Sequence, residues 1–326
     1  MNVVFIVFNR PECTQKVFRR ISAARPEQLL LIADGPRKSV SNDADRVALV
    51  RDIISRVDWP CTVHRNFADQ NLGCRARVSS GLDWAFSIVE EAIILEDDCL
   101  PDMSFFVFCR GMLDRFRHDE RVMHIGGGNY QHGIRRTSSS YYFSKYPHVW
   151  GWATWRRAWK HYDLEMKQWP ELRATGWLKL MCPREREHQF WTGIFDRAYD
   201  GKVDTWDYQW NFACWVNKGV SIVPALNLVE NIGFGPEATH TMEMSAGIKS
   251  VETGALAEIL RHPREIIVNK NADLYTFKTL FCPPQSLYIH IHKTFLNRYF
   301  YGRYFRKIPI LGNLWARWRV KRGQEI

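Results

Sequence analysis

Short apolar runs alternate with stretches of helical periodicity over the first hundred residues. The apolar runs are bounded by Pro, Gly, Asn or Asp, as is typical of buried strands, and cover residues 2–8, 28–32, 61–65 and 92–95. The periodic stretches predict helices that begin at Pro11 and that cover 43–57 and 72–88. This alternation predicts an α/β fold with a Rossmann-like, mostly parallel sheet flanked by helices.

The alternation is less regular in the rest of the chain. Helical spacing of apolar residues predicts helices over 105–116, 185–199 and 208–216. Strands are predicted over 122–125 and 220–223. Between these elements lies an aromatic block, residues 148–155, that contains Trp150, Gly151 and Trp152. Its tryptophans can pack against sugar rings or fill a core, and the pattern leaves both interpretations open.

Polar and acidic residues follow three of the predicted strands at the point where each ends. They are Asn9 and Arg10 after the first strand, Asp34 and Gly35 after the second, and Glu96, Asp97 and Asp98 after the fourth. The carboxyl ends of parallel strands meet at one edge of a sheet, where ligands bind. Adjacent carboxylates repel one another, and hard oxygen ligands suit Mg²⁺ or Mn²⁺. The pattern predicts a nucleotide-sized site for a cation that carries a diphosphate; a plain acidic turn is the alternative.

Composition favours a globular protein with a large core, because 46% of the 326 residues are hydrophobic and 14% are aromatic. No apolar run reaches the length of a membrane span, and from its first residues no secretory leader is expected. The eight cysteines include no C-x-x-C pair and no ordered spacing. They are therefore expected to be reduced thiols, mostly small buried residues of a cytoplasmic protein.

The net charge of +10 is concentrated near the C-terminus. Residues 286–326 hold nine Lys and Arg against one acidic residue, Glu325, and interleave them with Tyr, Phe and Trp. A basic aromatic segment without a long apolar run suits the interface of an anionic membrane. RNA could be bound by the same composition, but the chain has no recognised nucleic-acid module, so no nucleic-acid partner is expected. An ordinary C-terminal helix is the further alternative.

Four short motifs occur in order: Phe-Asn-Arg-Pro at 8–11, Ala-Asp-Gly at 33–35, Asn-Leu-Gly-Cys at 71–74 and Leu-Glu-Asp-Asp at 95–98. In this order the chain resembles the GT-A glycosyltransferases, most closely the bacterial relatives of the eukaryotic N-acetylglucosaminyltransferase that starts complex N-glycans. Those enzymes carry a Glu-Asp-Asp form of the Asp-x-Asp motif. The resemblance covers roughly residues 1–245. It implies a nucleotide-sugar-binding half over 1–128, an acceptor-binding half over 129–265 and a C-terminal extension over 266–326.

The resemblance assigns the strand-end residues to a nucleotide-sugar donor, expected to be UDP-linked, and to its Mn²⁺ or Mg²⁺. Asp98 would be the direct metal ligand, with Glu96 and Asp97 on the ribose or on metal-bound water. Asp34 would accept the N3–H of uracil. Further nucleotide contacts are expected from Asn9, Arg10 and Arg75. Each residue also has a plain structural interpretation, as a turn acid, a surface arginine or part of a capped helix start.

An acidic aromatic segment, residues 204–210, leads into the predicted helix 208–216. An inverting transferase needs a carboxylate that accepts the proton of the acceptor hydroxyl while that oxygen attacks the anomeric carbon. In the resembled enzymes this base precedes a helix in such a segment. The resemblance thus implies Asp207 as the catalytic base and Asp204 as the alternative, while a helix cap is the structural interpretation of Asp207.

Two further assignments follow from the resemblance. Many GT-A enzymes supply a C-terminal histidine to the metal or the diphosphate, and His240 resembles that residue. Trp150, Gly151 and Trp152 resemble the loop that lines the donor-sugar or acceptor side. An exposed loop histidine and core tryptophans are the alternatives.

The sequence therefore predicts a metal-dependent, inverting glycosyltransferase with a saccharide or lipid-linked saccharide acceptor, in surface polysaccharide or lipopolysaccharide synthesis. Its expected place is the cytoplasm, at the inner face of the cell membrane. A sugar-phosphate nucleotidyltransferase shares the sheet and the metal carboxylates, but it usually has a glycine-rich loop where this chain has Asn9, Arg10 and Pro11. A non-catalytic membrane or nucleic-acid binder would leave the acidic clusters without a role.

Overall fold

The computed structural model describes residues 1–233, 253–256 and 259–282. His240 and the basic segment 286–326 lie outside these ranges, so both assignments stay predictions. Contacts divide the chain into a compact unit, Met1–Phe277, and a second unit, Lys278–Ile326. The expected division of the chain at residues 128 and 265 also stays a prediction.

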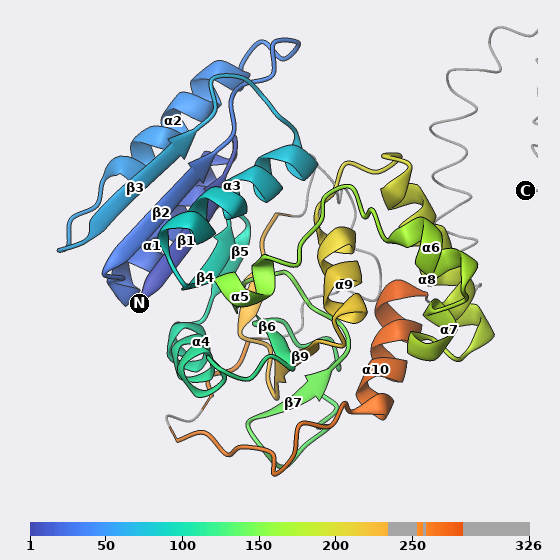
Figure 1. Cartoon of the computed structure of the whole chain (residues 1–326). Coiled ribbons are helices and arrows are strands. Elements are labelled where there is room, and N and C mark those ends of the chain that lie inside the picture. Colours follow the sequence, from blue (N-terminus) through green and yellow to red (C-terminus); the bar gives the residue numbers. More distant parts are fainter. Residues whose placement is uncertain (234–252, 257–258, 283–326) are drawn as a thin grey trace, which may run out of the picture. The chain divides into compact units, whose positions relative to one another are not determined.

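The first part of the chain alternates strands and helices in the predicted order (Figure 1). Its elements are β1 (Asn2–Val7), α1 (Pro11–Ala24), β2 (Gln28–Ala33), α2 (Asp43–Ser55), β3 (Thr62–Phe67), α3 (Cys74–Ile88) and β4 (Glu91–Glu96). In β1 and β2 every residue after the first is buried. This is expected of uninterrupted apolar runs, which form strands covered on both faces. Helix α1 begins at Pro11, where the missing N–H leaves no hydrogen bond unmade.

Eight strands form one sheet in the order β3-β2-β1-β4-β8-β6-β9-β7. The strands not yet named are β6 (Val122–Gly126), β7 (Tyr141–Ser144), β8 (Trp152–Trp155) and β9 (Val220–Pro224). β3, β2, β1 and β4 are mutually parallel, and β6 is parallel to β9, whereas β8 and β7 are antiparallel to their neighbours. The predicted fold class, a mostly parallel α/β sheet flanked by helices, is confirmed. Strand β8 lies within the aromatic block, for which the sequence predicts no strand.

Helices cover both faces of this sheet. On one face, alternate β1 side chains such as Val3 and Phe5 pack into one core with α1, α2 and α4 (Met103–Arg115). On the other face lies α3, whose Gly81 contacts Ile32 of β2. Because β2 and β4 both pair with β1, the carboxyl ends of these three strands lie side by side.

Shorter elements complete the described chain. β5 (Cys99–Pro101) and β10 (Val229–Asn231) form a two-stranded antiparallel sheet. The further helices are α5 (Arg156–Trp159), α6 (Trp169–Ala174), α7 (Leu178–Met181), α8 (Glu185–Tyr199), α9 (Asp207–Val216), α10 (Lys270–Thr276) and η1 (Phe277–Phe281). Aromatic side chains pack β8 against the start of α9: Trp152 stacks on Trp206 with 5.4 Å between ring centroids and lies 5.7 Å from Trp210. Such pairs stabilise a core beyond the area that they bury.

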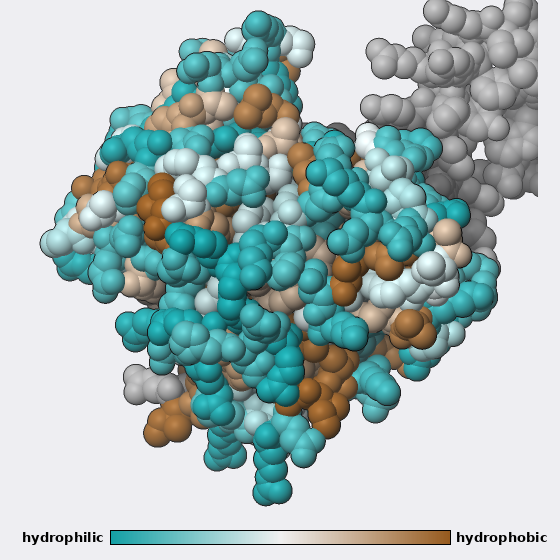
Figure 2. Space-filling view, viewed as in Figure 1, coloured by the Kyte–Doolittle hydropathy of each residue, from teal (hydrophilic) through white to brown (hydrophobic). Residues whose placement is uncertain are grey.

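Hydrophilic residues cover most of the face in view in Figure 2, and apolar residues form small separate groups on it. Among the described residues, no helix is both long enough and apolar enough to cross a membrane. All eight cysteines lie in the described ranges, none forms a disulfide, and four of them are buried.

Candidate functional site

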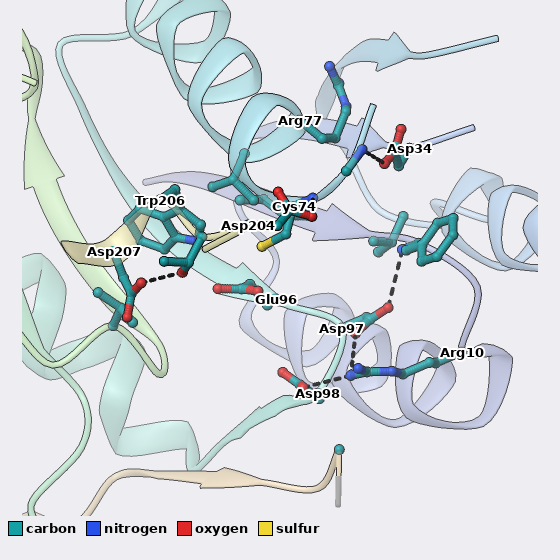
Figure 3. Close-up of a pocket in the computed structure, with 18 of the residues that line it drawn as sticks. Arg10, Asp34, Cys74, Arg77, Glu96, Asp97, Asp98, Asp204, Trp206 and Asp207 are labelled. Atoms are coloured by element: carbon teal, nitrogen blue, oxygen red, sulfur yellow. Dashed lines mark hydrogen bonds and ion pairs between the residues drawn. The ribbon is translucent and has the colours of Figure 1, made fainter. Parts of the chain in front are cut away.

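A cavity of about 720 Å³ lies at the carboxyl ends of β1, β2 and β4, facing the loop before α9 (Figure 3). The predicted site residues that line it are Arg10, Asp34, Glu96, Asp97, Asp98, Trp150, Asp204 and Asp207. Those that do not are Asn9, Arg75, Gly151 and Trp152. The three strand ends therefore converge on one site, and a second acidic segment from far along the chain faces them.

The three consecutive carboxylates after β4 lie beside Arg10 (Figure 3). Arg10 Nη1 donates to Asp98 Oδ2 at 2.7 Å and to Asp97 Oδ1 at 3.4 Å. The Phe8 N–H donates to Asp97 Oδ2 at 3.2 Å. All three side chains of this ion-pair cluster are less than one-fifth exposed. Arg10 is thus a cation that the chain itself supplies to the acidic run.

Burial and the neighbouring negative charges favour the protonated forms of Glu96 and Asp97. Burial raises the pKa of Asp97 to about 7, against the lowering effect of Arg10, and Asp98 adds to the rise. The pKa of Glu96 is raised well above its usual value by burial and by the negative charges of Asp98, Asp97 and Asp207. A cation that enters the cavity would favour the ionised forms again.

The residues present fit a cation that takes some of its ligands from the protein and the others from the substrate. No group of three His, Cys, Asp or Glu side chains in the described ranges is arranged to hold a metal. Mg²⁺ typically keeps several waters and binds through one or two carboxylates together with substrate phosphates. Asp98 offers such a carboxylate at the cavity. Gly233 lies against it so closely that an added Cβ would come within 2.3 Å of Asp98 Oδ2, so only glycine leaves this carboxylate unobstructed.

Asp34, after β2, orders the loop that leads into α3. Its Oδ1 accepts the N–H groups of Gly35 and Leu72, at 2.8 and 2.9 Å. Its Oδ2 accepts the Asn71 amide at 2.9 Å and the Gly73 N–H at 3.2 Å. A carboxylate has about four acceptor sites, so these donors nearly saturate it. The contact with uracil stays a prediction, while the structure gives Asp34 a clear role in holding the loop.

Asp204, from the loop before α9, packs against the start of α3. Its carboxylate accepts the Arg75 N–H at 2.9 Å and the Cys74 N–H at 3.3 Å. The Arg75 side chain extends elsewhere and donates to the Leu164 carbonyl at 3.0 Å and to Glu165 Oε1 at 3.1 Å. The N–H groups of Cys74 and Arg75 therefore already bind a carboxylate of the chain itself, and the expected nucleotide contact of Arg75 stays a prediction.

Asp207 is the first residue of α9, and Trp206 holds the N-cap position. Its Oδ1 accepts a hydrogen bond from the Thr205 hydroxyl. Its charge acts on Glu96, and Figure 3 shows the two side chains on facing sides of the cavity. The first residue of α9 thereby places a carboxylate opposite the acidic run.

Of the three predicted residues in the aromatic block, Trp150 alone lines the cavity. Trp152 is fully buried and stacks on His124 with 5.2 Å between ring centroids. The Gly151 carbonyl accepts the Gly127 N–H at 2.7 Å. The core alternative therefore describes the position of Trp152, whereas Trp150 is placed to contact a ligand.

Asn9 is not part of the cavity lining and instead helps to fix a buried carboxylate, Asp43. Asn9 Nδ2 donates to Asp43 Oδ1 at 2.5 Å. Arg37 donates to the same carboxylate from its backbone N–H at 2.8 Å and from its side chain at 2.9 Å. Its guanidinium also lies 5.1 Å from the centre of the Phe8 ring at the cavity wall. Asp43 therefore positions a cavity-lining arginine.

Replacing Asp43 with asparagine is expected to lower the free energy of unfolding at pH 7 by about 2 kcal/mol, because several hydrogen bonds to a buried charge are weakened. The Arg37 side chain lowers the pKa of Asp43 from 3.8 to about 2. The folded pKa lies below the unfolded one, so the stabilisation is present above pH 3.8 and is lost as the pH falls through about 2. Urea denaturation at pH 7 and at pH 3 measures both effects.

The matched control is Asp52→Asn on the same helix, where the side chain is 54% exposed and pairs with Arg56. This change is expected to alter stability by less than about 0.5 kcal/mol. Equal losses in the two variants would contradict the role given to Asp43.

Sequence reasoning missed several residues that line the cavity: Arg37, Asn71, Cys74, Arg77 and Tyr208. Asn71, Cys74 and Arg77 belong to the stretch that begins with the Asn-Leu-Gly-Cys motif, and the motif was the signal available for them. Arg77 is 5% exposed and donates to the Asn66 carbonyl and side chain, both at 2.8 Å. No sequence motif pointed to Arg37, because its position at the cavity depends on its hydrogen bonds to Asp43.

Comparison with known proteins gives structural likenesses alone. No family model matches the chain, and no curated protein matches its sequence. One similar structure is 4-diphosphocytidyl-2C-methyl-D-erythritol synthase from Anaerococcus prevotii DSM 20548, with 9% identity, a TM-score of 0.31, and 57% of this chain and 85% of that chain covered. Another is UDP-glucose pyrophosphorylase complexed with UDP-glucose, with 11% identity, a TM-score of 0.26, and 45% and 63% covered. Both TM-scores are low, so the function is argued from the residues of the site.

Proposed function

We propose that this protein is a GT-A-type glycosyltransferase that moves a sugar from a nucleotide-diphosphate donor, UDP-linked, to a hydroxyl of a saccharide or lipid-linked saccharide. The observation that carries the proposal is the placing of Asp207 in the same cavity as Glu96, Asp97 and Asp98. One side of the cavity thus offers charges for a diphosphate and its cation. The other side offers a carboxylate that can accept a proton.

On the donor side, Arg10 and a cation held by Asp98 would neutralise the charge of the diphosphate. Asp98 would hold a Mn²⁺ or Mg²⁺ ion, and Glu96 and Asp97 would contact the ribose or water around it. When bound, such an ion neutralises the diphosphate and stabilises the leaving group. Arg10, now paired with Asp98 at 2.7 Å, is close enough to donate to a phosphate oxygen instead.

On the acceptor side, Asp207 accepts the proton of the acceptor hydroxyl. The hydroxyl oxygen then forms a bond to the anomeric carbon as the bond from that carbon to the diphosphate breaks. Attack from the face opposite the leaving group inverts the anomeric centre. The proton ends on Asp207, and the electron pair of the broken bond leaves with the nucleoside diphosphate. The Trp150 and Tyr208 rings at the cavity wall are suited to pack on a sugar.

The biological setting remains part of the proposal. A role in surface polysaccharide or lipopolysaccharide synthesis, and a place at the inner face of the cell membrane, depend on residues 286–326 and on a lipid-linked acceptor. Binding of vesicles that contain anionic lipid by the full chain, and its loss on deletion of 286–326, would support that setting without bearing on the chemistry of the cavity.

The first test is calorimetric titration of the full chain with UDP, GDP, CDP and dTDP, each with Mn²⁺ and with a chelator. We expect UDP to bind in the presence of Mn²⁺ and to bind at least about tenfold more weakly without it, because the carboxylates then repel the diphosphate. Binding of another diphosphate would correct the donor. No binding of any diphosphate to the folded protein would contradict the proposal, and turnover of UTP with a sugar phosphate would favour a nucleotidyltransferase.

A further inference from the structure

Two carboxylates bind four consecutive backbone N–H groups at the start of α3. Asp34 accepts from Leu72 and Gly73, at 2.9 and 3.2 Å. Asp204 accepts from Cys74 and Arg75, at 3.3 and 2.9 Å. Asp34 comes from the end of β2, and Asp204 comes from the loop before α9. The segment 72–75 is therefore bound on one side by the nucleotide half of the site and on the other by the catalytic loop.

The first turn of α3 depends on Asp204 for its cap. The N-cap residue is Gly73, which has a φ of +80° and no side chain that could accept the free N–H groups of the turn. A Cβ at Gly73 would lie 3.0 Å from Asp204 Oδ2, so the glycine also leaves room for this carboxylate. A cap that is usually local is supplied here by a residue 129 positions away from Arg75.

The loop 203–206 is fixed at further points between Asp204 and α9. The Tyr162 hydroxyl donates to the Trp206 carbonyl at 3.2 Å. The Trp206 ring stacks on Trp152, and the Thr205 hydroxyl donates to Asp207. Asp204 thus binds one end of a short loop whose other end, the buried Trp206, leads directly into Asp207.

From this arrangement we infer that Asp204 is a positioning residue, and that it does not exchange protons with the substrate. Its carboxylate fixes the loop 203–206 to α3 and so places Asp207, the first residue of α9, against the donor site. The inference rests on the proposed function, in which Asp207 is the base. It favours Asp207 over Asp204 as the base, because each oxygen of Asp204 accepts a backbone N–H, which binds this carboxylate to α3 and occupies part of its capacity to accept hydrogen bonds.

Three variants of the full chain test this role: Asp204→Asn, Asp204→Ala and Asp207→Asn. The asparagine at 204 keeps an oxygen that can accept the Arg75 N–H, whereas alanine removes both bonds. We expect Asp204→Ala to lower kcat by about tenfold, because Asp207 is then held less well against the donor site, and Asp204→Asn to lower it by less. The pH profile of kcat and the affinity for UDP with Mn²⁺ are expected to stay as in the unaltered protein. Asp207→Asn should lose the base-dependent limb of that profile.

A second readout is independent of activity. Amide hydrogen exchange of the Cys74 and Arg75 N–H groups is expected to be about tenfold faster in Asp204→Ala than in the unaltered protein, because their acceptor is gone. Asp200→Ala, an exposed carboxylate after α8 that pairs with Lys202, is the matched control and should change neither exchange nor kcat.

Each result decides a different claim. Asp204→Asn as inactive as Asp207→Asn, with the same change in pH profile, would identify Asp204 as the base and overturn the inference. Unchanged exchange and unchanged kcat in Asp204→Ala would overturn it as well. No diphosphate binding and no transfer by the unaltered protein would instead refute the proposed function, while the exchange data would still report whether Asp204 caps α3.

Discussion

Replacement of Asp207 with asparagine is expected to reduce kcat by about a thousandfold while UDP binding with Mn²⁺ is kept. Asparagine has nearly the shape of aspartate and can still accept a hydrogen bond from Thr205, but it cannot take the proton of an acceptor hydroxyl. General base catalysis contributes roughly 10² to 10⁴ in rate, which sets the size of the effect. Sugar transfer at saturating donor, followed as UDP release across a range of pH, measures it.

The control for this prediction is Asp200→Asn, a surface carboxylate that pairs with Lys202 and is 43% exposed. We expect its kcat to match that of the unaltered protein. If Asp207→Asn kept more than about a tenth of the activity, proton transfer by this residue would contribute too little to be general base catalysis. Equal UDP affinities in calorimetry would confirm that any loss concerns the chemical step.

Replacement of Asp98 with asparagine is expected to abolish the effect of Mn²⁺ on UDP binding and to reduce turnover by about a thousandfold. The amide carries no charge, so it is a poor ligand for a hard cation, yet it keeps an oxygen that can accept from Arg10. Several kcal/mol of charge stabilisation on the leaving group would be lost, and about 4 kcal/mol corresponds to a thousandfold change in rate. Titration of UDP with Mn²⁺ and with a chelator measures the binding effect directly.

Asp52→Asn serves again as the control, because this exposed carboxylate lies on α2 and should leave the Mn²⁺ effect intact. Metal-dependent UDP binding that persists in Asp98→Asn would remove this residue from the metal site. Full activity of the unaltered protein in a chelator would show that Arg10 supplies enough charge without a metal, since its guanidinium already lies 2.7 Å from Asp98.

Much of the fold was predictable from the sequence, because burial leaves a local pattern. The unbroken apolar run before Glu96 becomes β4, and the helical spacing in 43–57 becomes α2. The direction of the chain alone puts Arg10, Asp34 and Glu96 at the carboxyl ends of their strands. Parallel pairing of β2, β1 and β4 then brings those ends together, and the cavity lies there. The order of elements along the first hundred residues, the fold class and the meeting of the strand ends follow from such local rules, whereas the order of the strands in the sheet does not.

The tertiary structure alone decided which polar groups are already in use, because their partners are far away in sequence. Asp204 and Asp207 are nearly equivalent in the sequence, but only the structure shows that Asp204 binds the N–H groups of Cys74 and Arg75. Trp150 and Trp152 are two positions apart, and only the packing of β8 against His124 puts Trp152 into the core. Sequence patterns report burial and chain direction, whereas hydrogen-bond partners depend on the path of the whole chain.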